Sequence, residues 1–198
     1  MQQPKRTYIS FDYAMKKLLR NKANFGILEG FLSTLLQFDL TVDEILESES
    51  NPDHSDDKSV RFDLLCNDHK GQLYIIELQY YYQLDYFQRI LFGTSKLLVD
   101  HMEKGDAYKK VKKVYSVSIL YFNLGQGKDY IYHGRTKFRG LHEQDSLLLN
   151  AAQRNYFNRK EVYELYPEYY ILKVNDFDDL AKDSLDEWIY FLKNSELP

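Results

Sequence analysis

Two alternating segments joined by a glycine-containing turn constrain this chain more than any other feature. Residues 60–66, VRFDLLC, present two sets of side chains to opposite sides of an expected strand: Val60, Phe62, Leu64 and Cys66 on one, and Arg61, Asp63 and Leu65 on the other. The residues NDHKGQ that follow have the chemistry of a turn between antiparallel strands. Residues 73–79, LYIIELQ, are rich in β-forming side chains. The pattern therefore predicts a β-hairpin.

The register of this hairpin decides which polar side chains meet. If Cys66 lies opposite Tyr74, then Asp63 falls opposite Glu77. Two facing carboxylates repel unless a cation lies between them, and Mg²⁺ prefers such hard oxygen ligands. The backbone carbonyl of Leu78 would add another oxygen. Two interpretations stay open on the pattern alone: Asp63, Glu77 and Leu78 bind Mg²⁺ or Mn²⁺, or they belong to one of the many half-exposed hairpins that carry such acids without a metal.

Three neighbouring polar residues extend this hypothesis. Gln79 shares the face of Glu77, and its neutral amide can orient a water molecule but cannot deprotonate it. Arg89 and Lys96 lie on the helix expected next, where they would either contact phosphate or solvate the helix surface. Both interpretations stay open at this point.

The segments around the hairpin suggest an α/β fold with a mixed sheet. Helices are expected at 8–20, 24–38, 85–102 and 184–194, the last opened by a capping box of Ser184 and Glu187. Strands are expected at 41–49, 129–133 and 169–174, with a doubly buried strand at 114–122 and a loop at 50–59. No linker divides the 198 residues, so we expect one domain, with a core at about 24–122 and a C-terminal extension at 123–198.

Composition excludes several classes of protein. A formal net charge of −4 opposes coating of nucleic acid by bulk charge, and the single cysteine, Cys66, excludes an internal disulfide. We find neither an apolar run of membrane-spanning length nor a secretory signal, so a cytoplasmic location without membrane contact is expected.

Basic residues are clustered along the chain. The clusters are Lys16, Lys17, Arg20 and Lys22; Lys104, Lys109, Lys110, Lys112 and Lys113; and Arg135, Lys137 and Arg139. Each is either a solvated face or, where clusters converge in space, a surface for phosphate.

Several segments, taken in their order along the chain, resemble those of the PD-(D/E)XK nuclease family transposases. They are DYAMKKLL, FGILEGFLSTLL, the hairpin with its Ile-Glu-x-Gln, the stretch from QRILFG to VYSVSIL with its Lys-Gly-x-x-Tyr, YYILKV, and LDEWIYFL. The set covers nearly the whole chain.

The resemblance implies a restriction-endonuclease-like core and a metal-dependent DNA endonuclease that promotes recombination. Asp63 then matches the metal-binding Asp, Glu77 matches the Glu of an E-x-Q motif, and Gln79 stands where the wider superfamily has Lys. Glu29 is our choice for the acid of the first core helix, against a surface role; Asp12 is the other candidate, or a helix N-cap. DNA is the expected partner, and cleavage of two strands would favour a homodimer. The alternative is a weak or inactive nuclease-fold domain that binds nucleic acid or protein.

Overall fold

A mixed β-sheet organises the chain. The computed structural model describes residues 24–46 and 61–194. Its strands form a six-stranded sheet of order β1-β2-β3-β4-β6-β5. The strands are β1 (Val42–Ile45), β2 (Leu64–Asp68), β3 (Leu73–Gln79), β4 (Val114–Leu120), β5 (Ile131–Arg135) and β6 (Glu168–Lys173). Neighbouring strands from β1 to β3 are antiparallel, β3, β4 and β6 are parallel, and β5 is antiparallel to β6.

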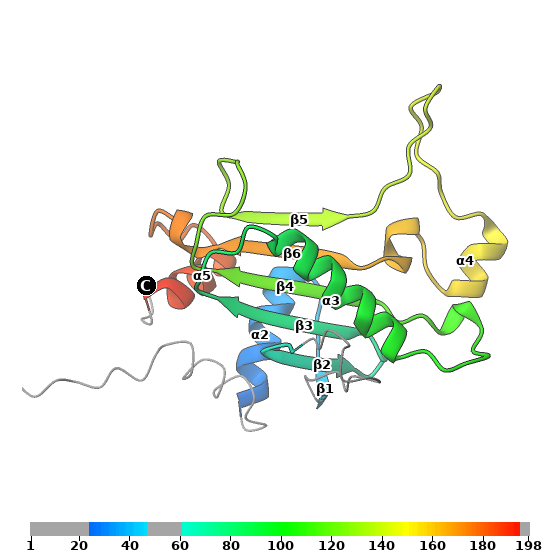
Figure 1. Cartoon of the computed structure of the whole chain (residues 1–198), viewed down its shortest axis with the longest axis horizontal. Helices are drawn as coiled ribbons and strands as arrows, with labels where there is room; N and C mark the ends of the chain where they lie inside the picture. The colour runs from blue at the N-terminus through cyan, green and yellow to red at the C-terminus, as the bar shows by residue number, and fades with distance from the viewer. Residues whose placement is uncertain (1–23, 47–60, 195–198) are drawn as a thin grey trace, which may run out of the picture.

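Helices flank this sheet, which confirms the expected fold class (Figure 1). The described helices are α2 (Phe25–Leu36), α3 (Tyr86–Asp100), α4 (Ala151–Phe157) and α5 (Ser184–Asn194), with 3₁₀ turns η2 (Tyr108–Lys110), η3 (Val162–Leu165) and η4 (Val174–Asp176). Figure 1 shows α3 in front of the sheet and α2 behind it. The largest apolar core lies on the side of α2 and α5, and smaller clusters lie on the side of α3.

The side-chain alternation of β3 agrees with the sequence. Cys66 pairs with Tyr74, as predicted. Tyr74, Ile76 and Leu78 enter the core with α2 and α5, whereas Leu73 and Ile75 pack on the other side of the sheet with Leu97 of α3. Strand alternation therefore directs Glu77 toward α3.

The alternation predicted for residues 60–66 is wrong at Phe62. The chain bends at Asp63, and β2 begins only at Leu64. Phe62 packs with Leu65 and Ile75 on the α3 side, instead of sharing the face of Leu64. The cause is the bend, because a strict period of two holds only within a regular strand.

The C-terminal part of the chain completes the sheet. β6 lies between β4 and β5, so residues of the expected extension pack directly against the expected core. The strand expected at 129–133 occupies Ile131–Arg135, and α4 was not predicted. The expected capping box of α5 is also wrong: Asp183 caps the helix, with its Oδ1 accepting from the N–H groups of Leu185 and Asp186 at 2.9 Å each.

Some expectations fall on residues outside the described ranges. These are the helix at 8–20 with Asp12 and its basic cluster, and the loop at 50–59. Within the described ranges, we find no helix with the length and apolarity needed to span a bilayer.

Candidate active site

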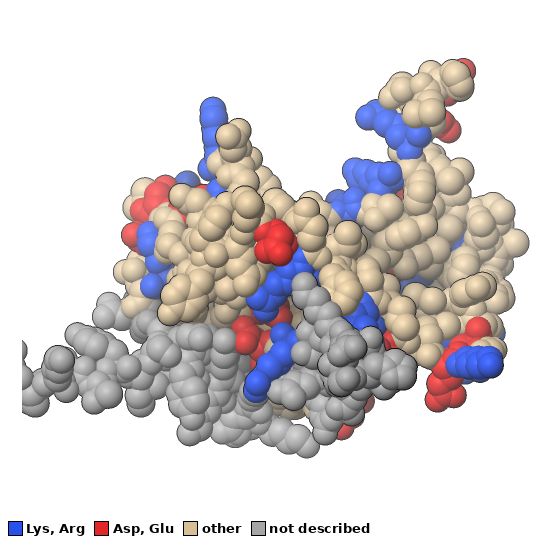
Figure 2. All heavy atoms as spheres, viewed as in Figure 1, with Lys and Arg blue, Asp and Glu red and all other residues tan. Residues whose placement is uncertain are grey.

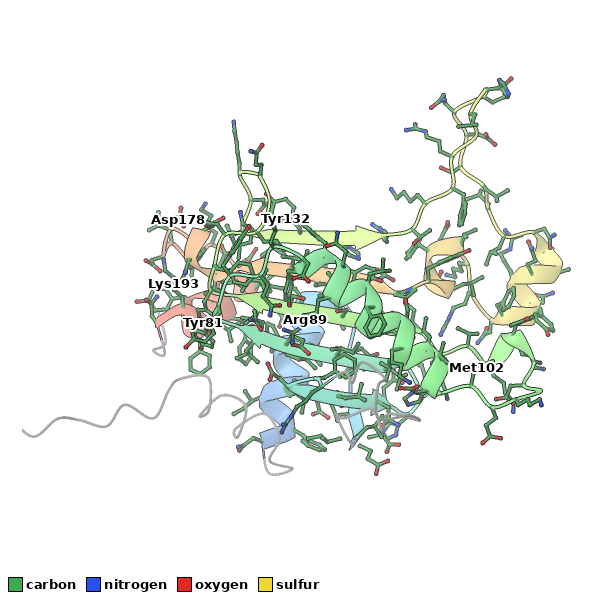
Figure 3. The ribbon with its side chains drawn as sticks, in the orientation of Figure 1. Tyr81, Arg89, Met102, Tyr132, Asp178 and Lys193 are labelled. Atoms are coloured by element: carbon green, nitrogen blue, oxygen red, sulfur yellow. The ribbon has the colours of Figure 1, made fainter. Side chains whose placement is uncertain are left out.

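A buried carboxylate on β3 is the centre of the candidate site. Glu77 is only 6% exposed, and its neighbours toward the start of the strand are apolar. A buried ionised carboxylate is costly without a partner. Arg89 of α3 supplies one, because its Nη2 lies 3.1 Å from Glu77 Oε2. Figure 3 shows Arg89 in the region between α3 and the sheet.

A second contact fixes the orientation of Arg89. Its Nη1 donates to Gln83 Oε1 at 3.0 Å, from the loop that leads into α3. The side chain of Arg89 stays 41% exposed, whereas that of Glu77 is 8% exposed. The guanidinium group of Arg89 therefore contacts the buried carboxylate of Glu77 while part of the Arg89 side chain faces solvent.

Asp63 reaches the same end of β3 by a different route. Leu64 is paired with Ile76, and at the bend just before β2 the Asp63 Oδ2 accepts a hydrogen bond from the Leu78 N–H at 2.8 Å. The Asp63 carboxylate thus accepts the hydrogen bond that a backbone carbonyl would accept if β2 began earlier. It lies beside the peptide that links Glu77 to Leu78. In a strand the N–H and C=O of one residue point the same way, so the Leu78 carbonyl also faces the side of Asp63.

A cavity of about 570 Å³ opens over Glu77 on the α3 side of the sheet. Arg61, Asp85 and Ser116 line it together with Glu77 and Arg89. Sequence reasoning missed Arg61 and Ser116 as candidates. The sequence signalled neither residue: the alternation that groups Arg61 with Asp63 fails at Phe62, which lines the same cavity, and a serine within an apolar strand gives no indication of a site.

Tyr86 is a buried neighbour of the site. Its side chain is fully buried. Burial raises the pKa of the Tyr86 hydroxyl; the negative charges of Glu77 and Asp63 raise it further, while Ser118 and Arg89 oppose them. The hydroxyl therefore lies within electrostatic reach of both carboxylates and stays protonated at neutral pH.

Glu29 does not join these residues. Its Oε1 accepts a hydrogen bond from the Val42 N–H at 2.8 Å. Val42 pairs with Asp68, at the far end of β2 from Asp63. At about 3.3 Å per residue, five residues separate the two positions by about 16 Å. The expectation that Glu29 completes the metal site fails, because α2 crosses the other face and reaches the sheet at β1.

The remaining expected residues occupy distinct positions. Gln79 ends β3, and its Nε2 donates to the Tyr81 carbonyl at 3.0 Å. Its Oε1 is left to accept a hydrogen bond. Lys96 forms an ion pair with Asp100 at 2.8 Å and does not line the cavity with Glu77. A phosphate-binding role for Lys96 therefore has no support from this geometry.

Comparison with known protein families gives a match over most of the chain. The model of the PD-(D/E)XK nuclease family transposases matches residues 9–197. The chain belongs to this family. Comparisons with curated proteins and with solved structures gave no match. Membership in the PD-(D/E)XK nuclease family transposases indicates a nuclease-like function for the chain.

PD-(D/E)XK nucleases generally use divalent metal ions. Among the described residues, there is no group of three or more His, Cys, Asp and Glu side chains arranged to hold a metal. Mg²⁺ does not need one, since it usually takes one or two carboxylates and keeps several waters. Asp63, Glu77 and the Leu78 carbonyl supply hard oxygen donors from one end of β3, so their chemistry fits such an ion.

Proposed function

We propose that this protein is a metal-dependent endonuclease that hydrolyses phosphodiester bonds in DNA in the cytoplasm. The observation that carries the proposal is the hydrogen bond from the Leu78 N–H to Asp63 Oδ2, which holds one carboxylate beside the strand that bears the other. Family membership and the buried position of Glu77 support it. The biological role that fits the family is DNA breakage that promotes recombination.

Asp63, Glu77 and the Leu78 carbonyl would hold Mg²⁺ or Mn²⁺. When bound, such an ion supplies Lewis-acid stabilisation of the charge that develops on the phosphate. The side chain of Asp63 is already oriented by its contact with Leu78, so little ordering is left for binding.

Arg89 and Gln79 would act on the substrate. Arg89 lines the cavity over Glu77, and its planar guanidinium can donate two hydrogen bonds to a phosphate. Gln79 would accept a hydrogen bond from the attacking water through Oε1, because its amide nitrogen is engaged with Tyr81. Gln79 cannot take the proton, so a solvent molecule or a phosphate oxygen must accept it.

One observation favours a second candidate function, a weak or inactive domain that binds nucleic acid. Glu77 Oε2 is already occupied by Arg89, and position 79 carries a neutral amide in place of a lysine. A metal must then displace or share the arginine contact. The two functions differ in whether divalent metal produces cleavage.

Nicking of supercoiled plasmid tests the proposal. The wild type is expected to nick DNA with Mg²⁺ or Mn²⁺ and to stop when EDTA is added. Asp63→Asn is a sharp control, because the amide oxygen of Asn can still accept from the Leu78 N–H while the charge is lost. We expect the rate of nicking by this variant to fall at least about 100-fold with unchanged folding. Equal rates for the variant and the wild type would remove Asp63 from the mechanism.

A further inference from the structure

A second polar cavity lies at the end of β3 opposite to Glu77. Its volume is about 570 Å³. Six of its lining residues are basic: Lys70, Lys109, Lys110, Lys112, Lys113 and Arg159. The acids that line it are Glu103 and Asp106. Since the whole chain has a formal net charge of −4, this concentration of positive charge is local.

Two of the six cations are neutralised by carboxylates. Lys110 forms an ion pair with Asp106. Lys113 is buried and lies 2.7 Å from Glu168. The other four have no ion pair with any residue in ranges 24–46 and 61–194: Lys70, Lys109, Lys112 and Arg159. We call these four residues the basic quartet.

The fold brings the basic quartet together from three separate segments. Lys70 belongs to the β2–β3 turn, Lys109 and Lys112 follow α3, and Arg159 follows α4. In Figure 1 all three segments lie at the same end of the sheet, on the right. Met102, which Figure 3 labels, marks the α3 end of this region, whereas Arg89 lies toward the other end of the helix.

Local contacts orient the side chains of the basic quartet. Gly71 has φ +69°, and a Cβ there would lie 2.8 Å from Lys112 Nζ, so the glycine allows the ammonium group to approach the turn. Arg159 Nη2 donates to Gln72 Oε1 at 3.3 Å. Gln72 is itself buried and donates to Asp68 Oδ2 at 2.7 Å. Lys109 lies over the ring of Tyr156, with Nζ 5.5 Å from the ring centroid.

A cluster of ammonium and guanidinium groups around a polar, open cavity suits phosphate oxygens. We propose that the basic quartet binds the phosphate backbone of DNA, at a site separate from the cavity over Glu77. This inference rests on the proposed function for the identity of the nucleic acid. Figure 2 shows that Lys and Arg on this face of the molecule lie in several separate groups, some of them next to Asp and Glu.

The spacing of the two cavities sets a length for the DNA. Gly71 lines the basic cavity and Glu77 lines the other, six residues further along the same chain segment. At about 3.3 Å per residue, this separation is about 20 Å. Duplex DNA rises about 3.4 Å per base pair, so about six base pairs span it. A duplex that occupies both cavities must therefore extend at least this far from the cut.

Fluorescence anisotropy with a labelled 20-base-pair duplex tests the inference. EDTA is present throughout, so that no cleavage occurs. The test variant is Lys70→Gln, Lys109→Gln and Lys112→Gln combined, which leaves the structural contact of Arg159 intact. The matched control is Lys128→Gln, Lys137→Gln and Lys182→Gln, which removes the same charge from exposed lysines outside the cavity.

The test variant should bind the duplex about tenfold or more weakly than the control at moderate salt. Its slope of log affinity against log salt should be shallower by about 2 to 3, because each lost phosphate contact removes about one unit. Equal affinity and equal slope for the two variants would overturn the inference. Binding of inorganic phosphate to the two variants separates a small-anion site from a DNA site. If the test variant loses phosphate binding but binds the duplex as tightly as the control does, the quartet is a small-anion site and the inference is overturned.

Failure of this inference can be told apart from failure of the proposed nuclease function. If plasmid nicking depends on Asp63 while the test variant binds DNA like the control, only the basic quartet is excluded. If nothing nicks DNA but the test variant binds DNA more weakly than the control, the quartet binds DNA and the nuclease function is excluded.

Discussion

Arg89→Ala gives the most informative perturbation of the candidate site. It removes the guanidinium that lies 3.1 Å from the buried Oε2 of Glu77. A hydrogen bond to a charged group contributes about 1.5–3 kcal/mol, and breaking a fully buried ion pair costs about 3–5 kcal/mol. Because the Arg89 side chain is 41% exposed, solvent screens its charge, and we expect a loss of about 2 kcal/mol.

The free energy of unfolding in urea, measured without divalent metal, gives this loss directly. Trp188 is the single tryptophan and packs against Phe31 of α2, with 5.7 Å between ring centroids, so its fluorescence reports unfolding of the core. In thermal unfolding the loss corresponds to a Tm lowered by about 4–8 °C. In a Glu77→Gln background, Arg89→Ala should cost less than about 1 kcal/mol, since the amide needs no counter-charge.

Divalent metal should then rescue the variant. Mn²⁺ is expected to raise the Tm of Arg89→Ala more than that of the wild type, because in the wild type Arg89 competes for the Glu77 carboxylate. An arginine cost unchanged by Glu77→Gln would refute the reasoning about the ion pair. An equal effect of Mn²⁺ on both proteins would refute the competition.

Three further predictions concern single side chains. Glu29→Ala should leave plasmid nicking within about twofold of wild type and cost about 1 kcal/mol of unfolding free energy, because it removes the acceptor of the Val42 N–H and does not touch the site; a loss of nicking comparable to that of Asp63→Asn would contradict this placement. Gln79→Ala should lower the nicking rate about tenfold with unchanged Mn²⁺ affinity, measured by calorimetry, since Gln79 orients water; weaker Mn²⁺ binding would instead make it part of the metal site. Burial raises the pKa of the Cys66 thiol from 9.0 to about 12, so Cys66 should resist alkylation at pH 8 until the protein unfolds. The stability that depends on the protonated thiol, fully present below pH 9, should be lost as the pH rises from 9 to 12. Rapid alkylation of the folded protein would show that the thiol is accessible.

The sequence predicted those parts of the fold that periodicity controls. β3 has the predicted bounds, and the pairing of Cys66 with Tyr74 follows from the turn length and from the side-chain alternation. The buried run that forms β4 was recognisable because a strand covered on both faces is apolar throughout. These features depend on neighbours along the chain.

Features that depend on packing across the molecule were not predictable in the same way. The alternation gives no sign of the bend at Asp63, because a bend is set by what the backbone contacts. Glu29 lies at the margin of the apolar stripe of its helix. That pattern does not indicate whether the glutamate reaches β1, as it does through the Val42 N–H, or the end of β2 next to Asp63. The position of β6 between β4 and β5 is likewise a matter of sheet order, which no local pattern contains.

The candidate site combines both kinds of information. Alternation placed Glu77 and Gln79 on one face, and the hairpin brought Asp63 to the same end of β3. The ion pair with Arg89 was not foreseen, although Arg89 was already a candidate. The apolar run before Glu77 indicates that this acid is buried, and a buried acid needs a cationic partner, but the sequence does not indicate which residue supplies the charge.

Diffraction from crystals soaked in Mn²⁺, recorded near the manganese absorption edge, tests the central claim most directly. Anomalous density identifies the metal without reference to any relative. We predict a peak within coordination distance of the carboxylates of Asp63 and Glu77 and the Leu78 carbonyl, with the Arg89 guanidinium moved from Glu77 Oε2. Manganese bound elsewhere, with the contact between Arg89 and Glu77 intact at saturating metal, would contradict it.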